Sequence, residues 1–86
     1  MRLYVGNISF RTSEKDLLEL FQNYGGTAPF VVREAGTNTS RGFAFIDVTE
    51  RLSLAAIKEL DGREFQGRVI KIAPAKQRRP EDPAYA

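Results

Sequence analysis

The fold follows from the stretch Arg41-Gly42-Phe43-Ala44-Phe45-Ile46-Asp47-Val48. As a β-strand, this stretch sends successive side chains to opposite faces of a sheet. One face is small or aliphatic and suits a core: Gly42, Ala44, Ile46 and Val48. The other face is aromatic and charged: Arg41, Phe43, Phe45 and Asp47. Because the solvent side of a half-buried strand is normally polar, two phenylalanines there indicate a surface for flat, apolar ligands.

The stretch Arg2–Gly6 repeats this pattern near the start of the chain. Leu3 and Val5 point to one face, and Tyr4 points to the other together with its neighbours Arg2 and Gly6. If the two strands lie side by side, three rings share one exposed surface, here called the aromatic platform: Tyr4, Phe43 and Phe45. Rings on a sheet surface stack on nucleic acid bases, so the pattern favours nucleic acid binding.

Both stretches resemble motifs of the RNA recognition motif family. Arg41–Phe45, followed by an aliphatic residue, resembles the family's octamer, and Leu3–Ile8 resembles its partner hexamer. The two motifs occur in the family's order, with a helix signal between them, and the resemblance covers residues 2–76. The last octamer position, usually aromatic, is Val48. We expect this departure to change packing only, because the side chain points inward.

The resemblance also implies roles for individual residues. Tyr4 and Phe45 would each stack one base, Phe43 would pack between sugars, and Arg41 would pair with a phosphate. Polar groups near Asn7 and on the fourth strand would touch base edges. Five further basic residues are candidates for RNA contact: Arg2, Arg33, Lys71, Lys76 and Arg78. The expected partner is single-stranded RNA of a few nucleotides, bound by a monomer at roughly micromolar strength.

Composition excludes several other classes of protein. The chain has 86 residues, enough for one small domain, and it contains no cysteine and no histidine. Disulfides, zinc held by Cys and His, and histidine acid–base catalysis therefore drop out. No apolar run reaches the ~18 residues of a membrane span, and the first residues lack a secretory signal. We expect no cofactor, no metal and no enzymatic activity. We expect a cytoplasmic location, with a nuclear or organellar one left open.

Charge is distributed unevenly along the chain although the net charge is only +2. Segments 2–11, 33–48 and 63–79, which are expected to be strands and loops, hold ten Lys or Arg and three acids. Segments 14–24 and 49–61, which are expected to be helical, hold three bases and six acids. The predicted molecule is basic on its sheet face and acidic on its helix face, as is typical of a nucleic acid binder.

The order of elements predicts an α+β fold. Strands are expected at 2–6, 29–34, 41–48 and 67–73, and helices at 14–24 and 49–61, which gives the order β-α-β-β-α-β. This order is typical of a ferredoxin-like sandwich, in which a four-stranded antiparallel sheet carries both helices on one face. Right-handed crossovers place the first and third strands together at the centre.

Local signals support these elements. Ser13 begins a capping box that ends at Asp16, and Thr49 is expected to cap the second helix. Pro29 favours an edge position for the second strand, and Phe30 in that strand is assigned to the core. Helical spacing assigns further side chains to the core or its edge: Leu17, Leu20, Phe21, Tyr24, Leu52, Ala56, Ile57 and Leu60, with Phe65 tucked beside them.

The chain is expected to divide into an RNA recognition motif domain over residues 1–76 and a flexible basic and polar tail over residues 77–86. Two alternatives to RNA binding stay open. Some members of the family bind partner peptides, and base stacking does not distinguish single-stranded DNA from RNA. An enzyme is the least favoured class, because most of the acids belong to helix faces and read as solvated charge.

Overall fold

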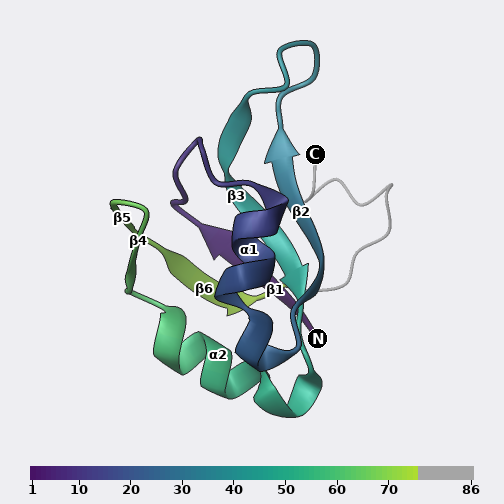
Figure 1. Ribbon diagram of the computed structural model, residues 1–86, viewed down its shortest axis with the longest axis vertical. Helices are drawn as coiled ribbons and strands as arrows, with labels where there is room; N and C mark the ends of the chain where they lie inside the picture. Colours follow the sequence, from purple (N-terminus) through teal and green to yellow (C-terminus); the bar gives the residue numbers. More distant parts are fainter. Residues whose placement is uncertain (76–86) are drawn as a thin grey trace.

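The structure is a computed structural model that describes residues 1–75 (Figure 1). The predictions for Lys76, Arg78 and the tail at 77–86 lie outside the described residues. The strands are β1 (Arg2–Gly6), β2 (Thr27–Arg33), β3 (Ser40–Asp47), β4 (Glu64–Phe65), β5 (Arg68–Val69) and β6 (Lys71–Pro74). The helices are α1 (Glu14–Leu20), followed by the 3-10 turn η1 (Gln22–Tyr24), and α2 (Ser53–Leu60), preceded by the 3-10 turn η2 (Glu50–Leu52).

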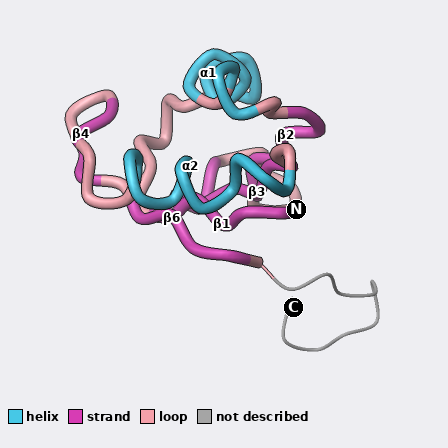
Figure 2. The backbone as a smooth tube through the Cα atoms, turned by 90° about the horizontal axis from the view of Figure 1, so that it is seen from below, coloured by secondary structure: helices cyan, strands magenta, loops and turns pink. Residues whose placement is uncertain are grey.

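Four strands form the main sheet in the order β2-β3-β1-β6, and every neighbouring pair is antiparallel. Both helices lie on one side of this sheet (Figure 2). The predicted ferredoxin-like sandwich is therefore confirmed, with β1 and β3 at the centre and β2 at an edge. Within residues 1–75, no helix is long and apolar enough to cross a membrane.

The first helix begins as its sequence predicts. The Ser13 side chain accepts a hydrogen bond from the Asp16 N–H at 3.2 Å, and the Asp16 carboxylate accepts one from the Ser13 N–H at 3.0 Å. This reciprocal capping satisfies two N–H groups that would otherwise lack partners. At the far end, Gly25 takes the left-handed conformation with φ of 72° and turns the chain toward β2. Thr49 precedes η2, but its side chain makes no capping hydrogen bond, contrary to expectation.

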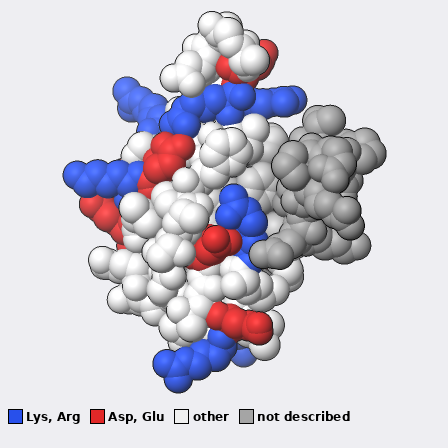
Figure 3. Space-filling model, turned by 90° about the vertical axis from the view of Figure 1, so that its right-hand side faces the viewer, with Lys and Arg blue, Asp and Glu red and all other residues white. Residues whose placement is uncertain are grey.

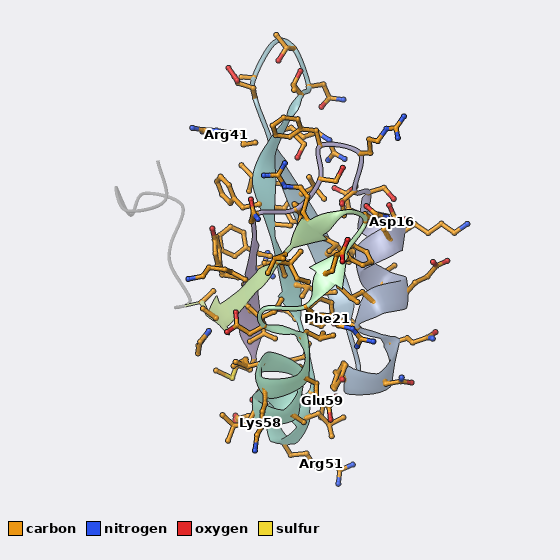
Figure 4. All side chains as sticks on the ribbon, turned by 90° about the vertical axis from the view of Figure 1, so that its left-hand side faces the viewer. Asp16, Phe21, Arg41, Arg51, Lys58 and Glu59 are labelled. Atoms are coloured by element: carbon orange, nitrogen blue, oxygen red, sulfur yellow. The ribbon has the colours of Figure 1, made fainter. Side chains whose placement is uncertain are left out.

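The core lies between the sheet and the helices. The strands contribute Leu3, Val5, Val31, Ala44, Ile46 and Ile72, and the helical segments contribute Leu17, Phe21, Ala56 and Leu60, all buried. Leu20, Tyr24 and Ile57 are partly buried against this core, as their helical spacing predicts, and Phe65 is partly buried at its edge, as expected for that connector. Phe21 projects from the end of α1 into the space between the two layers (Figure 4). Val48 is also buried, which confirms its inward direction.

The assignment of Phe30 to the core is wrong. Phe30 is 54% exposed, whereas its neighbour Val31 is 1% exposed and takes the core position. The strand also begins at Thr27 rather than at Pro29, and its register with β3 shifts between Thr27 and Phe30. A bulge of one residue reverses which side chains face the core, and simple alternation cannot reveal it.

The last predicted strand, 67–73, is divided in two. Its first part, β5, pairs with β4 in a small hairpin, and only β6 joins the main sheet. Gly67 has φ of 84° and forms the hairpin turn together with Gln66, whose φ is 53°. Ile70 and Ile72 are buried and Lys71 is exposed, as alternation predicts for the part that enters the sheet.

An ion pair ties the start of α1 to β2. Arg33 donates two hydrogen bonds to the Glu14 carboxylate at 2.7 and 3.1 Å, and the Val31 N–H donates a third at 3.1 Å. The Arg33 guanidinium in particular stabilises the charged form and lowers the pKa of Glu14 from its ordinary 4.5 to about 2. The carboxylate therefore stays ionised in the folded protein at a pH where the unfolded chain binds a proton.

Ile46 and Phe45 provide a test of the two strand faces. Ile46 is fully buried, so Ile46→Ala should lower the free energy of unfolding by about 2–5 kcal/mol. Phe45→Ala should cost clearly less, because that ring is only half-buried. Urea denaturation of both variants measures the difference. Equal losses would mean that the two faces are assigned incorrectly.

The Glu14–Arg33 pair should make stability depend on pH. Because the pKa of Glu14 is lowered in the fold, its contribution is complete above about pH 4.5 and is lost as the pH falls toward 2. Glu14→Gln should therefore destabilise the protein at pH 7, by ~1 kcal/mol or less for so exposed a pair. The difference between wild type and variant should shrink at pH 3. Denaturation at both pH values checks this, and a constant difference would contradict the role of the carboxylate charge.

Candidate functional site

Tyr4, Phe43 and Phe45 come together on the sheet face opposite the helices. The ring centroid of Tyr4 lies 6.0 Å from the centroid of Phe43 and 6.0 Å from that of Phe45. The centroids of Phe43 and Phe45 are 6.3 Å apart. The interplanar angles are 36°, 61° and 90°, so the rings meet edge to face or tilted. Such contacts hold each ring in place. All three rings are half-buried and keep part of their surface in solvent.

The strand register builds this platform. Tyr4 lies opposite Phe45, and Gly6 lies opposite Phe43, in the ladder between β1 and β3. Residues directly opposite each other in an antiparallel pair point to the same face. The core residues alternate with them, as in the pair of Leu3 with Ile46. The predicted platform is thus present in the structure.

Gly6 makes room for the Tyr4 ring. A Cβ atom at Gly6 would lie only 2.6 Å from Cε2 and 2.7 Å from Cζ of Tyr4. The ring therefore leans along β1 over the Gly6 backbone, where any larger residue would displace it. This role was not apparent from the sequence, in which Gly6 was only one residue of the outward face.

Arg2 is held above one ring of the platform. Its guanidinium carbon lies 5.5 Å from the centroid of Phe45, within the range of a cation–π contact. The same guanidinium donates to a carboxylate oxygen of Asp47 at 3.0 Å. Arg2 and Asp47 are directly opposite each other on β1 and β3, so they share the platform face. The structure thus places a cation next to a stacking surface and fixes it with an acid.

Two further basic residues lie on this face. Lys71 is exposed on β6 and lies opposite Gly6 in the ladder. Arg41 is exposed at the start of β3. It extends from one side of the sheet, whereas α1, with Asp16, lies on the other side (Figure 4). From the side of the molecule, basic side chains form a band beneath the β2–β3 loop, with acidic side chains next to it (Figure 3). Arg41 and Lys71 are thus two exposed cations on the face that carries the three rings.

Asn7 is engaged within the protein. Its amide nitrogen donates to the Val69 carbonyl at 2.8 Å, and its amide oxygen accepts from Arg68 at 2.7 Å. The residue has φ of 57°, a left-handed conformation that asparagine tolerates better than most residues. Thr12 donates to Gln66 at 2.6 Å and forms a second link. The loop after β1 is thus fastened to the β4–β5 hairpin.

Arg33 is not brought to the platform. It has the same facing as Val31 and forms the ion pair with Glu14 on the helix side of the sheet. Phe30, by contrast, lies on the platform face although the sequence assigned it to the core, because it is directly opposite Phe45 in the β2–β3 ladder. Within residues 1–75, no three His, Cys, Asp or Glu side chains form a group that could hold a metal ion.

The sequence is similar to a known family and to proteins named for RNA binding. The chain matches the profile described as the RNA recognition motif over residues 3–71. RbpD of Nostoc sp., named as a candidate RNA-binding protein, is 42% identical over 80 residues, which cover 91% of this chain and 85% of RbpD. RbpA of Synechocystis sp., with the same kind of name, is 39% identical over 80 residues, which cover 91% of this chain and 79% of RbpA.

Solved structures show the same architecture. The crystal structure of the RNA-binding protein PG1 superposes with a TM-score of 0.87 and 41% identity, covering 92% of this chain and 98% of that one. The domain of Rna15, solved with bound GU RNA, superposes with a TM-score of 0.76 and 26% identity, covering 88% of this chain and 83% of that one.

Gly6→Ala should disturb the platform without unfolding the protein. The new methyl group would push the Tyr4 ring out of position, so binding of single-stranded RNA should weaken by up to the ~1–3 kcal/mol of one stacked base. Fluorescence anisotropy measures the affinity, and thermal unfolding verifies the fold. In a Tyr4→Ala background the same change should have little further effect. A similar loss in both backgrounds would show that Gly6 acts by another route.

Proposed function

Because the chain belongs to the RNA recognition motif family, we propose that it binds single-stranded RNA on the aromatic platform. The observation that carries this proposal is the set of three partly exposed rings with centroids 6.0–6.3 Å apart, on the sheet face away from the helices. Ring faces of this kind stack on bases of any sequence. RNA binding is also the function that the family and the named relatives support together.

In this proposal, Tyr4 and Phe45 each stack one base, and Phe43 packs against the sugars between them. Arg41 and Lys71 hold phosphates at the edge of the platform. Each stacked base contributes ~1–3 kcal/mol, and each neutralised phosphate adds a salt-dependent term for single strands. A ligand of two to four nucleotides fits a surface of three rings, with an affinity in the micromolar range (roughly −8 kcal/mol).

Arg2 and Asp47 would adjust the site. Arg2 lies over Phe45 in the free protein, at 5.5 Å from the ring centroid, so a base that stacks on Phe45 must share this ring with the guanidinium. Asp47 keeps the guanidinium nearby through its 3.0 Å ion pair and adds negative charge that disfavours a phosphate at the same place. Asp47 thus offsets the positive charge of Arg2 above Phe45, which makes this place less attractive to a phosphate than a lone guanidinium would be.

The remaining candidates contribute in different ways. Asn7 would act by positioning the loop and the β4–β5 hairpin, with its spare hydrogen-bonding capacity left for a base edge. Arg33 would stabilise the fold through Glu14 and would not contact RNA. Lys76 and Arg78 stay in the proposal as phosphate contacts on the strength of their charge alone.

We propose that the protein binds RNA without catalysing a reaction, as a monomer in the cytoplasm. The cyanobacterial relatives named as candidate RNA-binding proteins support this location. The Rna15 domain solved with GU RNA supports the choice of RNA as the ligand.

The decisive experiment is an anisotropy titration with a randomised single-stranded RNA pool and its DNA counterpart at two salt concentrations. Wild type should bind RNA more weakly at the higher salt concentration. Tyr4→Ala/Phe45→Ala should lose about 2–6 kcal/mol, the stacking energy of two bases. Leu54→Ala is a suitable control, since Leu54 is 77% exposed on α2 in the helix layer.

Three outcomes would contradict the proposal. Undiminished RNA binding by the folded double variant would place the RNA elsewhere. Stronger binding to the DNA pool would make single-stranded DNA the ligand. No binding to either pool by folded wild type would turn the search toward a protein partner on the helix face.

A further inference from the structure

A fourth aromatic side chain adjoins the platform from the edge strand. Phe30 on β2 is 54% exposed and lies directly opposite Phe45. Phe45 in turn lies opposite Tyr4 on the next strand. These three aromatic residues therefore form one row across three neighbouring strands, Phe30, Phe45 and Tyr4, on a single face of the sheet. Single exposed apolar residues are common, but one that continues a row of rings forms part of a surface.

A bulge in β2 produces this arrangement. Thr27 pairs with Asp47 and Phe30 pairs with Phe45, so β2 advances three residues where β3 advances two. Without the extra residue, Pro29 would lie opposite Phe45, and Phe30 would lie opposite Ala44 on the helix side. Ala28, within the bulge, has φ of 51°, a left-handed conformation that is unfavourable for alanine. The irregular backbone thus moves the Phe30 ring from the core face to the platform face.

We propose that Phe30 is a fourth stacking position, which extends the bound RNA by one nucleotide toward the β2 edge. This inference rests on the proposed function and adds the direction in which the RNA continues beyond the base on Phe45. Neighbouring strands lie ~4.8 Å apart, so the row from Tyr4 to Phe30 spans two such steps across the sheet. A ring that is 54% exposed at the end of this row is chemically suited to a base and not to a phosphate.

Phe30→Ala tests the proposal with RNA pools of two lengths. Wild type should bind a randomised six-nucleotide pool more tightly than a three-nucleotide pool. The variant should lose about 5- to 160-fold in affinity for the longer pool, as expected for one stacked base, and should bind the shorter pool nearly as wild type does. Phe30→Tyr, which keeps a flat ring, should restore the affinity for the longer pool.

Controls separate this role from a structural one. Because the ring is more than half exposed, thermal unfolding of Phe30→Ala should stay close to that of wild type. Leu54→Ala, which removes an even more exposed side chain from the helix layer, should leave both affinities unchanged. A photo-crosslink from a thiouridine-containing six-nucleotide RNA to Phe30 would support the contact independently of any loss of stability.

The outcomes distinguish this inference from the proposed function. If Tyr4→Ala/Phe45→Ala abolishes binding while Phe30→Ala binds both pools like wild type, the fourth position is refuted and the platform stands. If Phe30→Ala weakens both pools equally, Phe30 does not extend the site, and the length-specific role is refuted. If Phe30→Ala changes only self-association in sedimentation experiments, the exposed ring serves contact between copies of the chain, and the inference also fails.

Discussion

The register between β1 and β3 is the constraint on which the rest of the structure depends. The ladder pairs Leu3 with Ile46 on one face and Tyr4 with Phe45 on the other. A slip of one residue would exchange the two faces, burying rings and exposing aliphatic side chains. The burial of the aliphatic residues therefore keeps the rings on the opposite, solvent-facing side of the sheet. The same backbone hydrogen bonds therefore position both sets of side chains: the aliphatic ones that stabilise the fold and the aromatic ones that form the platform.

The two ion pairs formed by arginines of the sheet have different roles. Arg33 and Glu14 join a helix to the edge strand on the helix side, where the charge stabilises the fold. Arg2 and Asp47 form a pair on the platform side, where the cation also meets the ring of Phe45. The overall division into a basic and an acidic layer, expected from the segment charges, is thus only partial. The role of each arginine depends on the face of the sheet where its side chain lies and on the carboxylate that it pairs with.

Sequence patterns predicted what depends on local rules. Alternation along β1 and β3 located the platform, and the Ser13 capping box located the start of α1, since both signals lie within a few residues. The facing of Phe30 could not be predicted in this way, because it depends on an extra residue whose left-handed backbone leaves no periodic trace. The partners of Asn7 are 61 and 62 residues away, so its structural role becomes visible only in the folded chain.

The pairing of β6 with β1 has a consequence for synthesis. Residues 3–6 of β1 pair with residues 71–74, so β1 gains its second neighbour only when nearly all of the described chain has left the ribosome. Until then, the strand that carries Tyr4 has unpaired N–H and C=O groups along one side. Open strand edges of this kind can pair with other chains. A polypeptide that stops before residue 71 would keep this edge open and would also lack the buried Ile72, so an unpaired strand and an incomplete core would both favour aggregation.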